Sequence, residues 1–552
     1  MRWAVPSRSA FPLTVAVLAF AFLGLFLAYP LWKVLASSFL DASGMRFTVE
    51  AYAKVLSTGY YRSAITNSLL IGALTTAASI AIGLPMAFLL ARMAIPGRSV
   101  LLALSALPLI LPSFIGAYAW VLLFGRAGIV TQWLQGLGLP TTTIYGLPGL
   151  VLVFTLHSFP YVLLPAIAAV RAVDASIEEA GQNLGASRWR VFLTVTVPVI
   201  MPAVLAGGLL VFIETLENFG VPFVLAEDMP ILAIEAYKLF VGEVGANPGM
   251  AGALAMILVL IAALALLVQR YYLGRRRFAT VARSAPPVLR PGPLGRWLAG
   301  GFVWGVVLLA ILPFIAIVIV ALMKFRGPVM QSEMSFGNFE QLFARSHRPL
   351  YNTLGLATVA AIGASLIGIP IAYVLTRYRS KLSHALDVLA MVPFAVAGTV
   401  MGIGLILAFN SGWLVLTGGW LILVLAWLVR KLPFSVRSGS AILHQIDPSL
   451  EEASINLGRS PSWTFFRLTV PLMLGGIVGG TVLAWVTIVS ELSSTVVLYS
   501  GPWSTMTVVM FRALEGQGAG AAAAAATVLI VATVVPLALV YRLLRRNNLA
   551  VL

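Results

Sequence analysis

The sequence predicts an all-α membrane protein of about twelve transmembrane helices, built as two tandem six-helix repeats. Hydrophobic residues make up 60% of the 552 residues and charged residues only 10%, against about 25% charged residues in soluble domains. Runs of 18 or more apolar residues recur along the chain, and such runs are typical of transmembrane helices. In addition, one pattern of polar residues and glycines occurs twice, once in each half.

Each apolar run has a place in the predicted order of spans. In the first half we expect spans near residues 11–36, 64–91, 99–124, 148–170, 196–220 and 249–273. In the second half we expect them near 297–323, 353–376, 384–409, 418–436, 471–492 and 519–541. The first run is longer than the 7–15 apolar residues of a signal peptide, and no small-residue cleavage site follows it, so we expect it to be retained.

The two halves align at constant offsets in residue number. Six matched pairs around the second and third spans all differ by 285: Asn67/Asn352, Gly83/Gly368, Pro85/Pro370, Ala87/Ala372, Arg92/Arg377 and Pro108/Pro393. Later pairs differ by 273, because the first half has a longer loop around 125–148. Constant offsets with one local insertion indicate duplication and fusion. We therefore assign 1–274 to the first half, 275–296 to an Arg- and Pro-rich linker and 297–552 to the second half. With six spans each, the halves form a parallel repeat, and a pathway is expected where they meet.

The polar pattern lies between apolar runs at matching places in the two halves. It runs through Glu179-Ala180-Gly181, Gly185 and Pro198, and again through Glu452-Ala453-Ser454, Gly458 and Pro471. The flanks also match, in the pairs Asp174/Asp447, Glu178/Glu451, Asn183/Asn456 and Leu184/Leu457. We interpret 174–190 and 447–463 as docking segments for a soluble partner, since helices that only packed would not retain such a polar match.

Local signals predict a short helix in each docking segment. Asp174 and Asp447 are suitable N-caps, and the paired glutamates suit the first helical turn. Gly185 and Gly458 then end the helices, because Gly readily adopts positive φ.

The repeated motif resembles that of permease subunits of binding-protein-dependent ABC importers, which is Glu-Ala-Ala, three residues, Gly, nine residues and Ile-x-Leu-Pro. The resemblance covers almost the whole chain, with departures at Gly181 and Ser454 for the second Ala, at Val195 and Leu468 for Ile and at Val197 and Val470 for Leu. It implies that each segment forms a coupling helix seated in a separate ATPase subunit. The residues implied in ATPase coupling are Glu178, Glu179, Ala180, Gly185, Glu451, Glu452, Ala453 and Gly458.

The resemblance also implies the partners and the location. Two ATP-binding cassette subunits would bind ATP-Mg and hydrolyse it, because this chain lacks a G-x-x-x-x-G-K-[ST] loop and we expect no cofactor in it. A substrate-binding protein would deliver a small solute from outside. The chain would be a multi-pass protein of the bacterial inner membrane, in contact with lipid, and would itself be a transport subunit and not an enzyme.

A fused double permease resembles the ferric-iron importers in particular, with thiamine permeases close by. The segments 214–220 and 490–495 carry this weaker resemblance, so ferric iron is the expected substrate. Related permeases carry polyamines, phosphonates or sugar phosphates, which remain alternatives. A duplicated secondary transporter driven by an ion gradient is a further alternative, which would need no ATPase and no matched polar segments.

Three acidic residues, Glu214, Glu217 and Glu491, fall within or at the ends of predicted spans. Acids at such positions are costly and usually face a cavity or the bundle interior. They could pair with basic side chains or cap broken helices, they could line a cation path, or they could reach the outer interface. Carboxylates suit ferric iron, but tight ligands would trap the ion, so we expect a weak lining of the translocation path and no stable metal site.

The net charge of +17 is explained by membrane topology. Most Lys and Arg lie in segments that face the cytoplasm if the N-terminus is inside, which is the positive-inside pattern. Both termini and the 275–296 linker are therefore expected in the cytoplasm, with no nucleic-acid partner. The chain has no Cys, so it has no disulfide or thiolate metal site. Its four His residues lack ligand spacing, and we expect unrelated surface or packing roles for His157, His347, His384 and His444.

Overall fold

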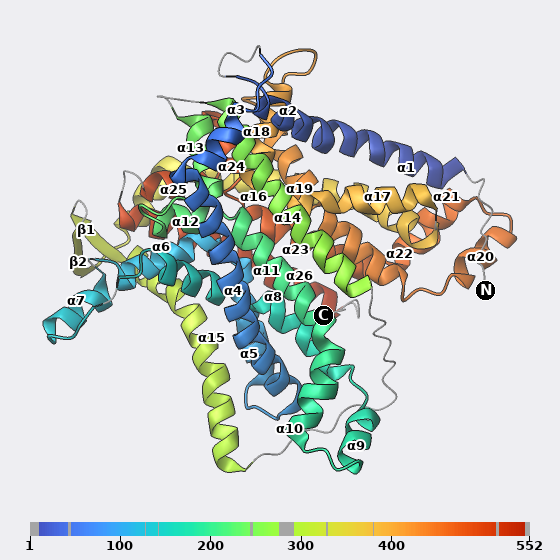
Figure 1. Cartoon of the computed structure of the whole chain (residues 1–552), viewed down its shortest axis with the longest axis horizontal. Helices are drawn as coiled ribbons and strands as arrows, with labels where there is room; N and C mark the ends of the chain where they lie inside the picture. Colours follow the sequence, from blue (N-terminus) through green and yellow to red (C-terminus); the bar gives the residue numbers. More distant parts are fainter. Residues whose placement is uncertain are drawn as a thin grey trace. The chain divides into compact units, whose positions relative to one another are not determined.

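A computed structural model shows the chain to be almost entirely helical (Figure 1). It describes residues 10–41, 46–126, 128–141, 143–242, 247–274, 292–326, 329–378, 380–514 and 518–546. Most of the predicted linker therefore lies outside the described residues. Its last four residues, 293–296, already belong to a helix that begins at Pro293.

The helices of the first half follow the predicted order of spans. They are α1 (Ala10–Leu23), η1 (Gly24–Ala28), α2 (Tyr29–Ser38), α3 (Glu50–Ser57), α4 (Gly59–Arg92), α5 (Arg98–Ile110), α6 (Ser113–Phe124), α7 (Ile129–Gly136), α8 (Leu147–Arg171), α9 (Ala175–Asn183), α10 (Arg188–Val191), η2 (Phe192–Thr196), α11 (Val197–Glu217), α12 (Gly220–Leu225), α13 (Leu232–Val241) and α14 (Pro248–Gly274).

The second half repeats this order and adds a two-stranded antiparallel hairpin. Its elements are α15 (Pro293–Ala321), β1 (Met323–Arg326), β2 (Val329–Met334), α16 (Gly337–Arg377), α17 (Lys381–Met391), η3 (Val392–Ala395), α18 (Gly398–Phe409), α19 (Trp420–Leu443), α20 (Ser449–Asn456), α21 (Pro461–Thr464), η4 (Phe465–Thr469), α22 (Val470–Leu472), α23 (Leu474–Val489), α24 (Thr495–Leu498), η5 (Gly501–Trp503), α25 (Met506–Arg512) and α26 (Ala519–Arg546).

The offsets found in the sequence hold at the level of whole elements. α6 and α18 have bounds that differ by 285, and the short π-helices η2 and η4 have bounds that differ by 273. A π-turn inside a helix is rare and is often found near functional positions. Such turns also occur elsewhere in the described residues, for example at η1, but η2 and η4 lie at matching places shortly after the two predicted coupling segments.

The chain divides into two compact units. One comprises residues 53–235 and 257–319, and the other comprises 1–52, 236–256 and 320–552. In the first unit α4, α8 and α11 pack together, and in the second unit their repeat partners α16, α19 and α23 do the same. Matched glycines allow this close packing: an added Cβ at Gly83 would lie 3.1 Å from Val162, and one at Gly368 would lie 2.7 Å from Ser435.

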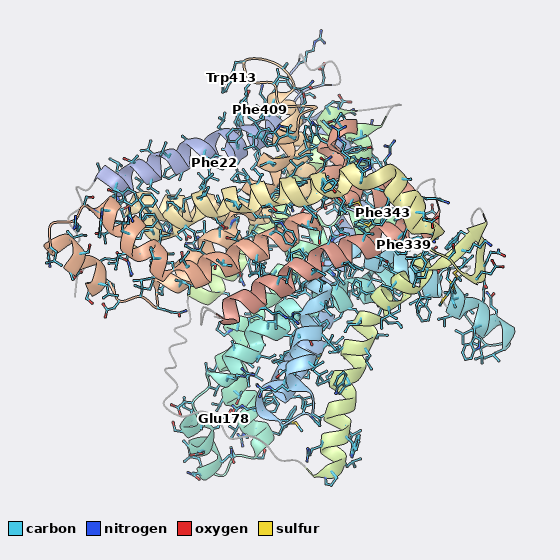
Figure 2. The ribbon with its side chains drawn as sticks, turned by 180° about the vertical axis from the view of Figure 1, so that it is seen from behind. Phe22, Glu178, Phe339, Phe343, Phe409 and Trp413 are labelled. Atoms are coloured by element: carbon cyan, nitrogen blue, oxygen red, sulfur yellow. The ribbon has the colours of Figure 1, made fainter. Side chains whose placement is uncertain are left out.

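The first span of each half belongs to the unit built on the other half's core. α1 and α2 lie in the unit of α16, where α1 contacts α16 and α17, and α2 packs against α18. Phe26 contacts both Phe22 and Phe409, which are labelled in Figure 2, at ring-centroid distances of 5.2 and 5.8 Å. In turn α15 belongs to the unit of α4, where Trp304 lies 3.1 Å from the Cβ position of Gly97. The compact units therefore do not coincide with the sequence halves.

The expected count of twelve spans is not confirmed. Among the described residues nine helices are long and apolar enough to cross a membrane, and two bent helix pairs raise the number to eleven. One pair, 381–395 with 398–409, is bent by 108°, and the other, 461–472 with 474–489, by 74°. The segment predicted near 418–436 is helical, as α19, but is not among these spans. This helix contains three basic residues, Arg430, Lys431 and Arg437, so it is too rich in charge to count as an apolar span.

Candidate functional site

The two polar segments form short helices, as their capping residues predict. Asp174 is the N-cap of α9, and its carboxylate accepts a hydrogen bond of 3.0 Å from the backbone N–H of Ser176. Asp447 makes the equivalent bond to the N–H of Ser449 at 2.9 Å, but the expected N-cap role is wrong here, because α20 begins one residue later than the offset of 273 predicts and its N-cap is Pro448. The bond holds the pKa of Asp447 below its usual range. It is therefore present at neutral pH and is lost as the pH falls through that lowered value.

A buried ion pair attaches the first docking helix to the end of a span. Nη2 of Arg92, the last residue of α4, donates to Oε1 of Glu178 at 2.7 Å. The hydroxyl of Thr196, at the end of η2, donates to the same oxygen at 2.6 Å. The side chains of Arg92 and Glu178 are only 3% and 15% exposed. Glu178, labelled in Figure 2, thus joins α9 to the end of α4 and to η2.

The second half builds the same attachment from the matching residues. Nε of Arg377 donates to Oε1 of Glu451 at 3.1 Å, and its Nη2 donates to the carbonyl oxygen of Ile446 at 3.0 Å. Here the additional donor is the phenol of Tyr373, 3.2 Å from Oε2 of Glu451. Thr469 matches Thr196, but its buried hydroxyl has no hydrogen-bond partner in the described part of the chain. The repeat therefore preserves the Arg–Glu pair and changes its third member.

The departures at the second Ala of the motif, Gly181 and Ser454, both face the turn that follows the docking helix. A Cβ at Gly181 would lie 3.1 Å from the side chain of Val191. At the matching positions the hydroxyls of Ser454 and Thr464 are 2.8 Å apart. Gly181 thus leaves room for Val191 in one half, whereas in the other half a hydrogen bond between the matching residues holds the docking helix against the following turn.

Two leucines at the ends of the docking helices are almost fully exposed. Leu184 is 89% and Leu457 is 84% exposed, although both follow polar helices. Glu179, Ala180 and Ala453 are exposed as well, and Glu452 is partly so. Both repeats thus leave an apolar side chain exposed at the same place beside the docking helix.

The glycines that follow these leucines adopt the left-handed conformation that the sequence predicts. φ is +85° at Gly185 and +87° at Gly458. An added Cβ at either position would have no atom of the described chain within 4 Å. The glycines are therefore required by the turn itself, and the space beside them is open to a partner.

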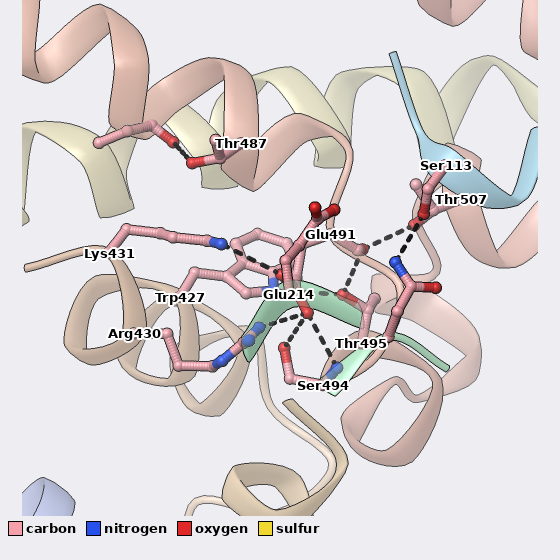
Figure 3. A network of polar contacts seen from close by, with 12 residues as sticks. Ser113, Glu214, Trp427, Arg430, Lys431, Thr487, Glu491, Ser494, Thr495 and Thr507 are labelled. Atoms are coloured by element: carbon pink, nitrogen blue, oxygen red, sulfur yellow. Dashed lines mark hydrogen bonds and ion pairs between the residues drawn. The ribbon is translucent and has the colours of Figure 1, made fainter. Parts of the chain in front are cut away.

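Glu491 lies in a buried polar cluster that neutralises its charge (Figure 3). Its Oε1 is 2.6 Å from Nη1 of Arg430, and its Oε2 is 3.6 Å from Nζ of Lys431. The contact to Nη1 lacks hydrogen-bond alignment, so it is an ion pair held by charge attraction. The backbone N–H and the hydroxyl of Ser494 also donate to Oε1, at 3.1 and 3.2 Å. Of the three interpretations of this acid, pairing with a basic side chain is the one observed.

Glu214 contacts different partners in the other unit. Its Oε2 accepts a hydrogen bond of 2.7 Å from the hydroxyl of Ser158, and its Oε1 lies 3.2 Å from Nε2 of His157. His157 matches Arg430 by the offset of 273, so each repeat places a basic group beside a membrane acid. The sequence did not show this contact between His157 and Glu214. Glu217, one turn further along α11, ends that helix.

The sequence analysis identified several of the residues in these contacts but not which of them contact each other. Arg92 and Arg377 were matched as a pair, and so were Glu178 and Glu451, but the link between the two pairs needed the fold. Arg430 and Lys431 gave no signal beyond two charges in an apolar run, which could have drawn attention to them. Among the described residues no three His, Cys, Asp or Glu side chains come together as a metal site would require.

The chain belongs to the family of inner membrane components of binding-protein-dependent transport systems, whose sequence profile matches residues 79–279 and 364–548. It is therefore a permease of the ABC importer class, and the two matches correspond to its two repeats.

Known relatives span most of the chain. A ferric transport system permease of Actinobacillus pleuropneumoniae is 28% identical, over 92% of this chain and 74% of that protein. A putative ferric transport system permease of Haemophilus influenzae is 28% identical, over 86% of this chain and 76% of that protein. The molybdenum transport system permease of Escherichia coli is 32% identical, but over only 30% of this chain and 72% of that protein.

Proposed function

We propose that this chain is the membrane subunit of an ATP-driven importer for ferric iron. The observation that carries the proposal is the duplicated docking helix: a buried Arg–Glu pair attaches α9 to the end of α4 and α20 to the end of α16. A push on a surface helix reaches the spans only if the two are rigidly joined. A pair with one side chain 3% exposed provides such a joint.

Each docking helix would receive one ATPase subunit. Leu184 and Leu457 would fill apolar depressions in those subunits. Glu178 and Glu451 would transmit the motion through their arginines, whereas Glu179, Ala180, Glu452 and Ala453 would contact the partner directly. Gly185 and Gly458 would allow the ATPase backbone to come close. ATP-Mg would bind to and be hydrolysed in those separate subunits, and both termini would share their cytoplasmic side.

Ferric iron is proposed because two relatives that cover most of the chain are named for ferric transport. A binding protein would deliver the iron from the opposite side of the membrane. Glu491 is already neutralised by Arg430 and Lys431, so its proposed role is to hold α19 against the segment after α23. Glu214 and Glu217 remain the proposed weak cation lining of the translocation path.

Reconstitution in liposomes tests this proposal. The purified chain would be combined with its ATPase and its binding protein, and uptake of radioactive ferric iron would be measured with ATP and with a non-hydrolysable analogue. Uptake should require hydrolysis and should persist when ionophores collapse the proton and sodium gradients. Uptake driven by a gradient without ATP would identify a secondary transporter instead.

The substrate is tested separately from the class. Molybdate, thiamine, a polyamine, a phosphonate and a sugar phosphate would each be offered with the same components. ATP-driven uptake of one of these, with no uptake of iron, would retain the importer and replace its substrate.

A further inference from the structure

A polar pocket lies beside the second docking segment and has no role in the function proposed above. It has a volume of about 670 Å³ and lies between the end of α16, the beginning of α17 and the end of α19. Four basic side chains line it: Lys381, His384, Arg437 and His444. The only acid in its lining is Asp387.

The charges of this lining are not balanced from within. Nη2 of Arg437 lies 3.3 Å from Oδ1 of Asp387, so the single acid is already paired. Lys381 and His384 have no ion pair or side-chain hydrogen bond in the part of the chain that the structure describes. Nδ1 of His444 lies 2.6 Å from the carbonyl oxygen of Ser440 and donates to it, so Nε2 can donate to an anion only when the ring carries both protons.

A second polar group in the wall also lacks a partner. Thr376, on the last turn of α16, lines the pocket, and its hydroxyl is buried without a hydrogen-bond partner among the described residues. Most buried hydroxyls are satisfied by protein or by ordered water. An unsatisfied donor beside excess positive charge points to an anionic ligand with several acceptor oxygens.

Two positions of the pocket lining have arginines at the matching positions of the first repeat. Arg98 matches Ser383 by the offset of 285, and Arg171 matches His444 by the offset of 273. Nε of Arg98 is buried without a hydrogen-bond partner in the described chain.

We propose that the pocket between α16, α17 and α19 binds a phosphate-bearing anion, either a free phosphate or the headgroup of an anionic lipid. Lys381 and His384 on α17 and His444 at the end of α19 would share its oxygens. Charge-assisted hydrogen bonds of this kind are about twice as strong as neutral ones. Four residues separate His444 from the start of α20, so a bound anion would fix the end of the helix that leads into the docking helix.

The binding site rests on the pocket alone, whereas its effect on coupling rests on the proposed function. The test therefore begins with binding. Inorganic phosphate would be titrated calorimetrically into the purified chain in detergent, and its melting temperature would be recorded with phosphate or with chloride at equal ionic strength. We expect saturable binding and a rise of at least about 2 °C with phosphate.

Two double variants make the test specific. Lys381→Gln with His444→Gln should weaken phosphate binding at least about tenfold and abolish the rise in melting temperature. Arg296→Gln with Arg542→Gln removes two positive charges outside the pocket and should leave both unchanged. The proposal would be overturned if both double variants lost phosphate affinity equally, or if phosphate did not bind saturably to the unaltered chain.

The source of the phosphate group is distinguished in lipid nanodiscs. If the ligand is a lipid headgroup, discs containing phosphatidylglycerol should raise the melting temperature over discs of phosphatidylcholine, and free phosphate should add nothing further. If it is free phosphate, the rise with phosphate should be equal in both discs. ATP hydrolysis by the assembled complex is measured separately, so a failed coupling assay would not be mistaken for a failed binding site.

Discussion

Nη2 of Arg92 lies 2.7 Å from Oε1 of Glu178, and the pair joins the last residue of a 34-residue span to the first turn of the docking helix α9. Arg377 and Glu451 repeat the contact at 3.1 Å in the other half. Since each pair has little solvent access, its charges interact strongly, and removal of one partner leaves a buried charge uncompensated.

The first prediction concerns this pair. Glu178→Met should lower the free energy of unfolding by about 3–5 kcal/mol, because Arg92 is left unpaired. Arg92→Met combined with Glu178→Met should recover most of that loss while uptake remains impaired. Unfolding in detergent measures the cycle, with Glu333→Gln, which opens the exposed Lys324–Glu333 pair, as a control that should change little. Additive losses in the double variant would contradict a coupled pair.

The second prediction concerns the glycines at the ends of the docking helices. Gly185→Trp with Gly458→Trp should still insert and fold but should lose uptake, because the large side chains fill space open to the ATPase. Positive φ adds a strain of about 1–2 kcal/mol per position. Gly412→Trp carries a similar strain, at φ +96° and with open space around it, and should retain ATP hydrolysis by the complex. Normal uptake by the double variant would refute the coupling assignment.

The third prediction concerns the two bare leucines. Leu184→Asp with Leu457→Asp should prevent the ATPase from co-purifying with the chain. Because both side chains are almost fully exposed, the free energy of unfolding should change by only about 0.5 kcal/mol per site. Leu137→Asp, at an exposed leucine after α7, is the control that should retain the ATPase. If the ATPase still binds the double variant with unchanged affinity, these leucines are not part of the interface.

The fourth prediction separates the membrane acids. Glu491→Gln should destabilise the chain by about 3–5 kcal/mol, because Arg430 and Lys431 lose their buried counter-ion. Glu214→Gln with Glu217→Gln should instead fold nearly normally and transport more slowly, if these two line a cation route. Melting curves recorded beside proteoliposome uptake distinguish the two roles. A fully active and stable Glu214→Gln, Glu217→Gln variant would remove the cation-path proposal.

The fifth prediction concerns topology. Ser284 lies in the predicted linker, outside the described residues, and the chain has no native Cys. Ser284→Cys should resist a membrane-impermeant thiol reagent added to intact cells and should react once the cells are opened. Labelling from outside would contradict the cytoplasmic placement of the linker and of both termini.

The sequence by itself determined the features that are encoded locally. The length of an apolar run predicts a span, and Asp and Gly mark the ends of the helices α9 and α20. Constant offsets in residue number show the duplication. Each of these signals lies in residues that are close together along the chain. The sequence did not predict where a span is interrupted. Pro108 and Pro393 were matched as a pair, but the 108° bend between residues 381–395 and 398–409 was not predicted.

Only the tertiary structure decided which charges meet. Arg92 and Glu178 are 86 residues apart, and Arg377 and Glu451 are 74 apart, so no local pattern specifies the pairing. The same holds for the exchange of α1 and α15 between the two units and for the pocket formed by the ends of α16, α17 and α19. A buried charge requires a partner, but the sequence around it does not identify that partner. The partner is determined by the packing of helices that are distant in sequence.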